Sequence, residues 1–362
     1  MGVYMIKKIG VVFTIAIMLV VPAISLIHSE TEAYPSWDVT FKKGYYVSSL
    51  NSVETDIYNQ LDIAIGSEYE SPEPRDALPI SLSLSAGVFF EGNDAEEKAK
   101  DYVKELVDKV LTVKYYSDVR SIWLWNYPVT NPVYDITITD STMEIDGDTR
   151  HVKIPTECSF TLEVEDRFKG KVAESINAVL KNSLISNTSD PITNIRNIYS
   201  ILSSIEVIDD EDGKTSTVYD ALVEKKSSSI GIAIAFKAMA SINNISSIVV
   251  TGKYYGDSDE GKNHFWNYVE YDGKWYILDA TVPDCLMLGY NETLSDKPVI
   301  SVLREGDVDG LYPLSPPDLN RNSYEFPDDR SFIEKNGSSF IIIAIGVLLI
   351  ASIVMAIRQG LA

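Results

Sequence analysis

The residues best placed for chemistry are a histidine and an aspartate on either side of an Asp-Gly pair. His264 precedes the pair at 272–273 and Asp279 follows it, both within runs rich in β-branched and aromatic residues. An Asp-Gly pair between two such runs predicts an antiparallel hairpin with a two-residue loop. Counting outwards from this loop, Trp266 faces Asp279. His264 then faces Thr281.

This register places His264 and Asp279 on the same face of the hairpin as diagonal neighbours. Such neighbours are about 7–8 Å apart at the backbone, a distance that these side chains can close to a hydrogen bond. A carboxylate in that position could orient the imidazole, as a histidine base requires. The alternative is a satisfied core histidine without a chemical role.

Ser229 stands at the start of a nearly all-apolar stretch, which predicts a buried helix over Ile230–Met239. Its hydroxyl could act as a nucleophile if His264 removes the proton directly. Serine is also a common N-cap, and Ser227 and Ser228 suit that role equally well. Residue type alone leaves both interpretations open.

Three motifs in this stretch resemble the transglutaminase-like (papain-like) family. Tyr219–Glu224 and Ser229–Ala238 look like the helix-opening motif of that family, in which a cysteine begins the buried helix. His264–Asn267 and Gly273–Asp279 resemble the strands that carry the family's histidine and aspartate. The three motifs occur in the family's order and with compatible spacing.

Carried over by position, the resemblance puts Ser229 in place of the cysteine nucleophile, His264 in place of the base and Asp279 in place of the orienting acid. The family's chemistry uses a thiolate beside an imidazolium at a helix N-terminus, where the helix dipole favours negative charge. A hydroxyl is far harder to ionise, so Ser229 is expected to be a poor nucleophile. Neither Cys158 nor Cys285 stands at the required position.

The resemblance implies an α+β fold with a papain-like (transglutaminase-like) core, in which a buried helix packs on an antiparallel sheet. The sequence divides into a β-rich N-terminal domain at 34–156, a transglutaminase-like domain at 157–290 and an acidic, Pro-containing stalk at 291–338. Apolar residues at helical spacing predict further helices over Ala95–Val110, Phe168–Leu180 and Ile192–Leu202, the last with Asp190 as cap and Pro191 at its first position.

Both ends of the chain carry apolar segments with flanking charges. Residues 1–27, with two lysines before the apolar run, are typical of a signal peptide or an uncleaved signal anchor. Residues 339–357 are followed by Arg358 and predict a transmembrane helix across a bilayer core of about 30 Å. Because basic flanks stay inside, residues 28–338 are expected outside the cell, on a single- or double-pass membrane protein.

The composition excludes several partners and cofactors. The formal net charge is −22 and no block of Lys or Arg forms a phosphate-binding face, so nucleic acid is not an expected partner. The three histidines and two cysteines lack metal-ligand spacing, so we expect no metal and no cofactor. A disulfide between Cys158 and Cys285 is neither required nor excluded.

Together these patterns favour a membrane-anchored extracellular pseudoenzyme that keeps the family's cleft and binds a polypeptide or cell-envelope component. The alternative is a hydrolase of peptide or ester bonds with Ser229, His264 and Asp279 as its triad. The sequence determines neither the ligand nor the oligomeric state.

Overall fold

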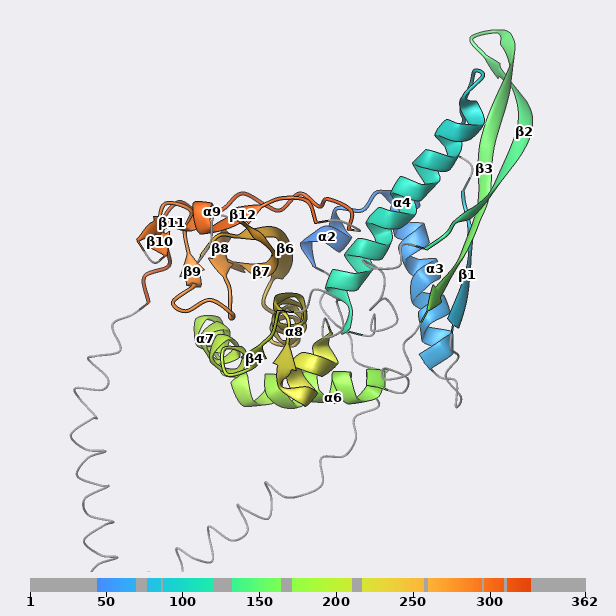
Figure 1. Cartoon of the computed structure of the whole chain (residues 1–362). Coiled ribbons are helices and arrows are strands. Elements are labelled where there is room, and N and C mark those ends of the chain that lie inside the picture. The colour runs from blue at the N-terminus through green and yellow to red at the C-terminus, as the bar shows by residue number, and fades with distance from the viewer. Residues whose placement is uncertain are drawn as a thin grey trace, which may run out of the picture.

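The computed structural model (Figure 1) describes residues 44–69, 77–85, 87–119, 132–163, 171–209, 217–256, 260–294, 296–308 and 311–326. The predicted signal segment at 1–27 and the predicted transmembrane helix at 339–357 lie outside these ranges. No helix within them is both long and apolar enough to cross a membrane. The fold is α+β, with two larger antiparallel sheets that belong to successive parts of the chain.

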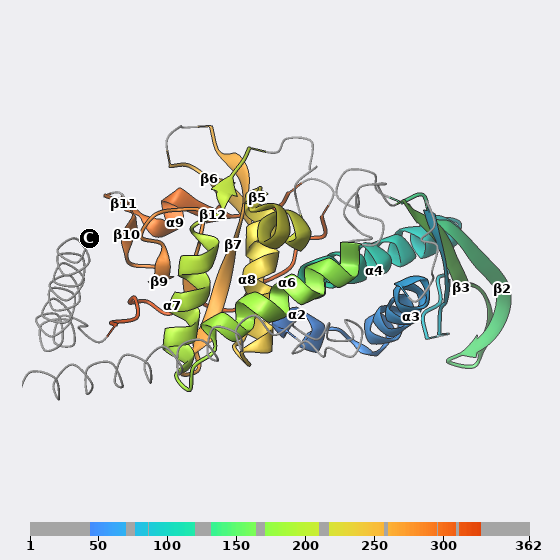
Figure 2. The same ribbon diagram turned by 90° about the horizontal axis from the view of Figure 1, so that it is seen from below.

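The N-terminal part is built on a three-stranded sheet in the order β1-β3-β2. Its strands are β1 (Ala77–Ser83), β2 (Asp135–Ile145) and β3 (Asp148–Glu163). The helices are α2 (Tyr45–Ser48), α3 (Ser52–Tyr69) and α4 (Ala95–Ser117). Both long helices, α3 and α4, pack against the sheet (Figures 1 and 2). The helix predicted over Ala95–Val110 is the first part of α4.

The structure corrects the predicted β-rich domain at 34–156. Helices α3 and α4 together contain more residues than the strands of this part. The predicted boundary at 156 also cuts β3, whose pairing with β1 runs from Glu157 to Glu163. Helix α3 escaped prediction because its apolar residues do not keep to one face: Ile57, Leu61 and Ile65 are buried, whereas Ile63 is exposed.

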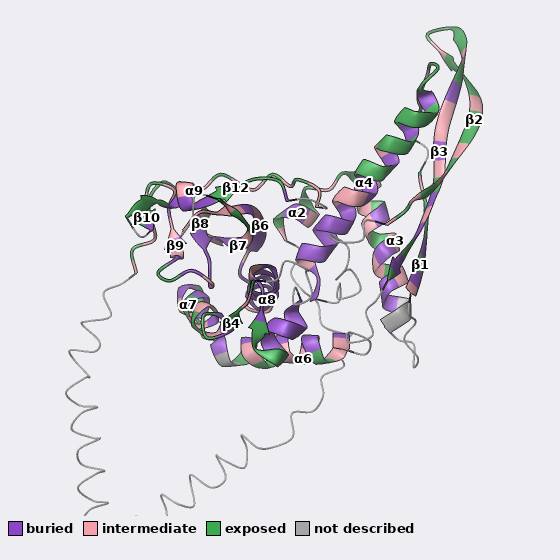
Figure 3. Cartoon of the chain, viewed as in Figure 1, coloured by how far each residue is buried: buried purple, intermediate pink, exposed green. Residues whose placement is uncertain are grey.

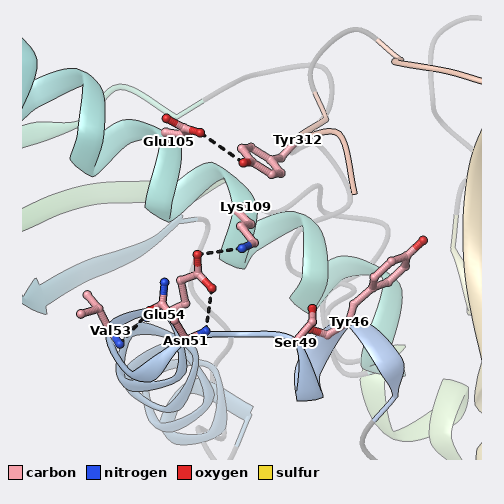
Figure 4. Close-up of polar contacts among 8 residues, drawn as sticks. All are labelled: Tyr46, Ser49, Asn51, Val53, Glu54, Glu105, Lys109 and Tyr312. Carbon is pink, nitrogen blue, oxygen red and sulfur yellow. Dashed lines mark hydrogen bonds and ion pairs between the residues drawn. The ribbon is translucent and has the colours of Figure 1, made fainter. Parts of the chain in front are cut away.

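The start of α3 is fixed by a reciprocal cap (Figure 4). The Asn51 side-chain oxygen accepts hydrogen bonds from the N–H groups of Val53 and Glu54, at 2.9 and 3.0 Å. The Glu54 carboxylate accepts one in return from the Asn51 N–H at 2.8 Å, and its other oxygen pairs with Lys109 of α4 at 2.7 Å. One cap thus sets both the start of α3 and its position against α4.

The second part is built on a five-stranded antiparallel sheet in the order β12-β6-β7-β8-β9. Its strands are β6 (Ser247–Tyr254), β7 (Lys262–Tyr271), β8 (Lys274–Leu278), β9 (Leu286–Leu288) and β12 (Leu303–Glu305). Helix α8 (Ser229–Ile242) packs on β6 and β7, and α6 (Lys171–Ser186) and α7 (Pro191–Leu202) pack on α8 (Figure 2). The shorter elements are β4 (Glu206–Val207), η3 (Asp220–Glu224), β5 (Lys226–Ser227), β10 (Thr293–Leu294), β11 (Lys297–Pro298) and α9 (Val299–Val302).

Local sequence explains the two helices that frame the candidate site. Helix α8 is apolar on nearly all sides, with Lys237 as its one charged residue, and is buried from Ile230 to Ser241. Helix α7 begins at Pro191, and the Asp190 carboxylate accepts hydrogen bonds from the N–H groups of Ile192 and Thr193. The predicted apolar stripe of α7 is buried: Ile192, Ile195, Ile198 and Leu202.

The hairpin predicted from the Asp-Gly pair is confirmed. Asp272 and Gly273 have φ angles of 51° and 68°, the positive values that a type I′ turn requires. The pairing runs from Tyr271 opposite Lys274 to Asn267 opposite Leu278 without a shift. The first residue beyond β8 in this register is Asp279.

The structure also corrects the predicted stalk at 291–338 over its described part, which ends at Phe326. This part contains β10, β11, α9 and β12, the last within the main sheet. Beyond them, the Tyr312 N–H donates to Thr112 Oγ1 of α4 at 3.1 Å, and the Asn320 N–H donates to the Trp275 carbonyl at 2.8 Å. Apolar side chains between the prolines pack this segment against the core: Leu311, Leu314, Leu319, Tyr324 and Phe326.

Candidate active site

His264 and Asp279 meet as the hairpin register predicts. The His264 Nε2 and Asp279 Oδ2 atoms are 2.6 Å apart, and the side chains are 12% and 1% exposed. His264 lies on β7, and Asp279 directly follows β8. Two adjacent antiparallel strands therefore bring together residues that are fifteen positions apart in sequence.

Thr281 holds the other oxygen of the Asp279 carboxylate. Its backbone N–H donates to Oδ1 at 2.8 Å, and its hydroxyl donates to the same oxygen at 2.6 Å. With Oδ1 held by Thr281, Oδ2 is directed at His264. The sequence placed Thr281 opposite His264 but assigned it no role. The Asp-x-Thr spacing after β8 is the signal that could have identified it, because a threonine two residues on can bond back to an aspartate.

Aromatic rings flank the His264 imidazole. The Tyr254 ring of β6 lies 5.2 Å from it between centroids, and the Trp266 ring of β7 lies 6.2 Å from it in a stacked orientation. Nε2 faces Asp279, and within the described residues no hydrogen bond reaches the other ring nitrogen, Nδ1. The imidazole is thus oriented through one nitrogen, and the second is available to another group.

Ser229 is the first residue of α8 and is half-buried. The N-cap is Ser228, whose side chain makes no capping hydrogen bond. Of the three serines, Ser228 therefore occupies the cap position and Ser229 the position that the resemblance gives to the nucleophile. Among the described residues, the Ser229 hydroxyl makes no hydrogen bond to His264 or to another group.

The packing of α8 on β7 brings Ser229 and His264 to the same end of the sheet. The buried Asn267 amide donates to the carbonyls of Ala233 in α8, at 2.9 Å, and Ile248 in β6, at 3.1 Å. Strand β6 runs back from the end of α8, and β7 is antiparallel to β6, so α8 and β7 run in the same direction. Ser229 precedes Ala233 by one helical turn, and His264 precedes Asn267 by three residues.

The segment before α8 supports its first turn. A Cβ atom on Gly231 would lie 2.1 Å from Ser227 Oγ and 2.8 Å from the Thr217 carbonyl oxygen, so only glycine allows this close approach. Asp220, at the start of η3, is buried and accepts hydrogen bonds from the N–H and hydroxyl of Thr217. Asp220 of the motif at 219–224 thus holds Thr217, which packs against the first turn of α8.

Neither cysteine is available as a nucleophile. Cys158 and Cys285 are both free and buried. Burial raises the pKa of the Cys158 thiol to about 12. Burial, and then the Asp279 carboxylate, hold the pKa of the Cys285 thiol well above its usual range. Both thiols are therefore protonated near neutral pH. Within the described ranges, no group of three or more His, Cys, Asp or Glu side chains could hold a metal ion.

Comparison with protein-family models gives a match over the part of the chain that carries the candidate site. The profile of the transglutaminase-like superfamily matches residues 178–280, from α6 to the residue after Asp279. The chain therefore contains a transglutaminase-like domain. A comparison with curated protein sequences finds no match.

Some solved structures have a low level of likeness to the chain. A structure described as a TGase has 15% identity and a TM-score of 0.26 over 41% of this chain and 45% of its own. A candidate cysteine protease from Cytophaga hutchinsonii has 14% identity and a TM-score of 0.26, over 49% of this chain and 68% of its own. The periplasmic domain of TgpA from Pseudomonas aeruginosa has 12% identity and a TM-score of 0.24, over 41% of this chain and 62% of its own. The chain thus spans less than half of the TGase structure.

Proposed function

We propose that the protein is a membrane-anchored, outward-facing transglutaminase-like pseudoenzyme, which binds a polypeptide or a cell-envelope component without turning it over. The observation that carries this proposal is the serine at position 229, at the start of α8. This is the position where the family chemistry needs a thiolate. The binding role rests on the pair of His264 and Asp279, and the membrane anchor rests on the two apolar segments.

The chemistry of the hydroxyl supports loss of turnover. A thiol beside an imidazole at a helix N-terminus ionises readily, whereas a serine hydroxyl must give up its proton to the base during attack. That transfer needs hydrogen-bond reach between Ser229 and His264, and no such bond links them in the described structure. The buried thiols of Cys158 and Cys285 offer no substitute.

The retained pair of His264 and Asp279 supports a binding role. With Nε2 held by Asp279, the imidazole presents Nδ1 at a site that is 12% exposed, where it could exchange a hydrogen bond with a peptide or ester group. A group of this kind contributes orientation and specificity to a ligand without any bond being broken.

The membrane anchor and outward orientation rest on the apolar segments at 1–27 and 339–357 and their flanking basic residues. Protease added to intact cells should remove residues 28–338. Survival of this whole region under conditions that digest a known surface protein would refute the orientation.

The alternative function is a serine hydrolase, which is favoured by the intact network of His264, Asp279 and Thr281. A serine-reactive fluorophosphonate probe distinguishes the two functions on the unmodified protein. The pseudoenzyme predicts no labelling of Ser229. Stoichiometric labelling that disappears in both Ser229→Ala and His264→Ala would overturn the pseudoenzyme and establish the hydrolase.

A Ser229→Cys variant tests whether the site can still support nucleophilic chemistry. The thiol would stand at the helix start beside the base, so we expect faster alkylation by iodoacetamide than for the buried native cysteines. The matched control is Ser229→Cys combined with His264→Ala. Equal alkylation rates in the two variants would show that His264 does not reach position 229.

A further inference from the structure

Strand β2 forms an edge of the three-stranded sheet and is eleven residues long. It lies outermost in two perpendicular views, with β3 between it and β1 (Figures 1 and 2). Most of its residues are exposed, particularly towards the tip of the β2–β3 hairpin (Figure 3). It belongs to the N-terminal part of the molecule and not to the sheet that carries His264.

The backbone pairing shows which groups of β2 point outwards. Lys153 of β3 exchanges hydrogen bonds with Phe90, at 3.0 and 2.9 Å, on the side away from β2. Its opposite residue on β2, Asp140, is therefore in a non-hydrogen-bonded pair and directs its N–H and C=O to the open side. Alternation gives Ile138, Thr142 and Glu144 the same direction, and no described residue bonds to their backbone groups.

The other edge strands of the two larger sheets are shorter than β2, and one of them is partly covered. On β1, the outward N–H and C=O of Ser83 both bond to the Gln60 side chain, at 2.9 Å each. By alternation from Ser83, Pro79 is also an outward position of β1, and it has no N–H to expose. The two edge strands of the larger sheet, β9 and β12, have three residues each. The long open edge of β2 is thus an exception within the described structure.

Charge near the open edge favours a basic partner. On β3, the cations directly opposite β2 are Arg150 and Lys153, and both are already paired, with Glu91 at 3.2 Å and with Asp140 at 2.7 Å. The acidic residues around the tip that have no ion-pair partner in the described structure are Glu144, Asp146 and Asp148. Antiparallel pairing with a second copy about Thr142 would set Asp140 against Glu144, which places like charges opposite each other. Pairing with a second copy in this register is therefore disfavoured.

A groove of about 800 Å³ adjoins the first residues of β2. It lies between α4, which contributes Lys100, Asp101, Lys104 and Asp108, and the segments 132–136 and 311–313. Lys153 bridges Asp140 and Glu96 of α4, so the outward residues of β2 have their side chains on the α4 face. A strand added beside β2 would send every second side chain over the same face as the groove.

We propose that β2 accepts an extended, basic polypeptide segment of another protein as an additional strand. Main-chain hydrogen bonds to Ile138, Asp140, Thr142 and Glu144 would hold the segment, as in other cases of strand addition. The acidic tip would select for Lys and Arg, and the groove would take side chains from the N-terminal end of β2. This surface is independent of the proposed function of the His264 site.

The test uses the full-length protein and a fluorescein-labelled peptide that alternates Lys with Val and Thr. A peptide with Glu in place of Lys is the ligand control. We expect saturable binding of the Lys peptide, weakened by salt, with slower amide exchange at the four outward positions of β2. Absence of binding at about 1 mM, or equal binding of the Glu peptide, would overturn the proposal.

Two variants locate the bound peptide. Thr142→Pro removes an outward N–H and should weaken binding about tenfold, whereas Thr142→Ala keeps the N–H and should bind as the unmodified protein does. Asp146 and Gly147 join β2 to β3, with positive φ angles of 53° and 85°. Glu144→Gln with Asp146→Asn removes two charges and keeps this turn, because Asn-Gly also favours a type I′ turn. Several-fold weaker binding is therefore expected. His264→Ala should have no effect. If neither β2 variant changes the affinity, the peptide binds elsewhere and the proposal fails.

Discussion

Replacing Thr281 by valine tests whether the Asp279 carboxylate is held as the structure indicates. Valine has nearly the shape of threonine but cannot donate the 2.6 Å hydrogen bond to Oδ1. Asp279 is 1% exposed, so water does not readily replace the lost donor. A hydrogen bond to a charged group contributes about 1.5–3 kcal/mol, and the free energy of unfolding should fall by that amount.

Two controls separate the hydrogen bond from packing. Thr281→Ser keeps the hydroxyl and loses one methyl group, so it should cost at most about 1 kcal/mol. In an Asp279→Asn background the acceptor is neutral, and the valine substitution should cost only about 0.5–1.5 kcal/mol. The difference between the two backgrounds is the coupling between Thr281 and the charge of Asp279.

The assay is urea unfolding followed by tryptophan fluorescence, with the transition midpoint compared at constant slope. If Thr281→Val costs no more than Thr281→Ser, the hydroxyl does not support the carboxylate. An equal loss of stability from Thr281→Val in the unmodified protein and in Asp279→Asn would also refute the reasoning. The strength of the hydrogen bond would then not depend on the charge of residue 279.

Three further predictions concern buried groups. Cys158 and Cys285 should react with Ellman's reagent only after unfolding, since burial raises both pKa values; fast reaction of the native protein would contradict their burial. Gly231→Ala should lower the free energy of unfolding in urea by at least about 1–3 kcal/mol, because the added Cβ would meet backbone and side-chain atoms. Its control is Gly273→Ala, at φ +68° with open space around it. This control should cost only the about 1–2 kcal/mol of a left-handed residue. Lys114→Met should lower the free energy of unfolding by about 3–5 kcal/mol, because the buried Asp118 carboxylate, 3.0 Å from the Lys114 Nζ atom, would lose its cation. A thermal scan that shows no change in the unfolding temperature would refute this prediction.

Local patterns predicted the parts of the fold that depend on neighbouring residues. The Asp-Gly pair fixed the β7–β8 register, and with it the contact between His264 and Asp279. The Asp190-Pro191 pair marked the start of α7 in the same way. In both cases a turn or cap dictates the conformation within a few residues, so no distant contact is needed to decide the outcome.

Long-range pairing accounts for most of what the sequence analysis missed. The proline- and aspartate-rich composition after residue 291 is compatible with a stalk, and only the partners of β12 and Tyr312, on β6 and α4, show that this region is packed. The role of Thr281 is also invisible in composition, because it depends on where Asp279 directs its oxygens. The distance between Ser229 and His264 likewise depends on how α8 docks on the sheet.

The return of the C-terminal segment to α4 has a consequence for the order of folding. Thr112 and Tyr312 are 200 positions apart, which at a synthesis rate of about 5–20 residues per second separates their appearance by on the order of 10–40 s. Strand β12 follows β6 by about 50 residues, so the edge of β6 that β12 covers is open to mispairing for on the order of 2–10 s of that interval. Contacts of such long sequence separation also slow folding once the chain is complete. The packing of residues 311–326, the last described part of the chain to be synthesised, therefore completes the native structure.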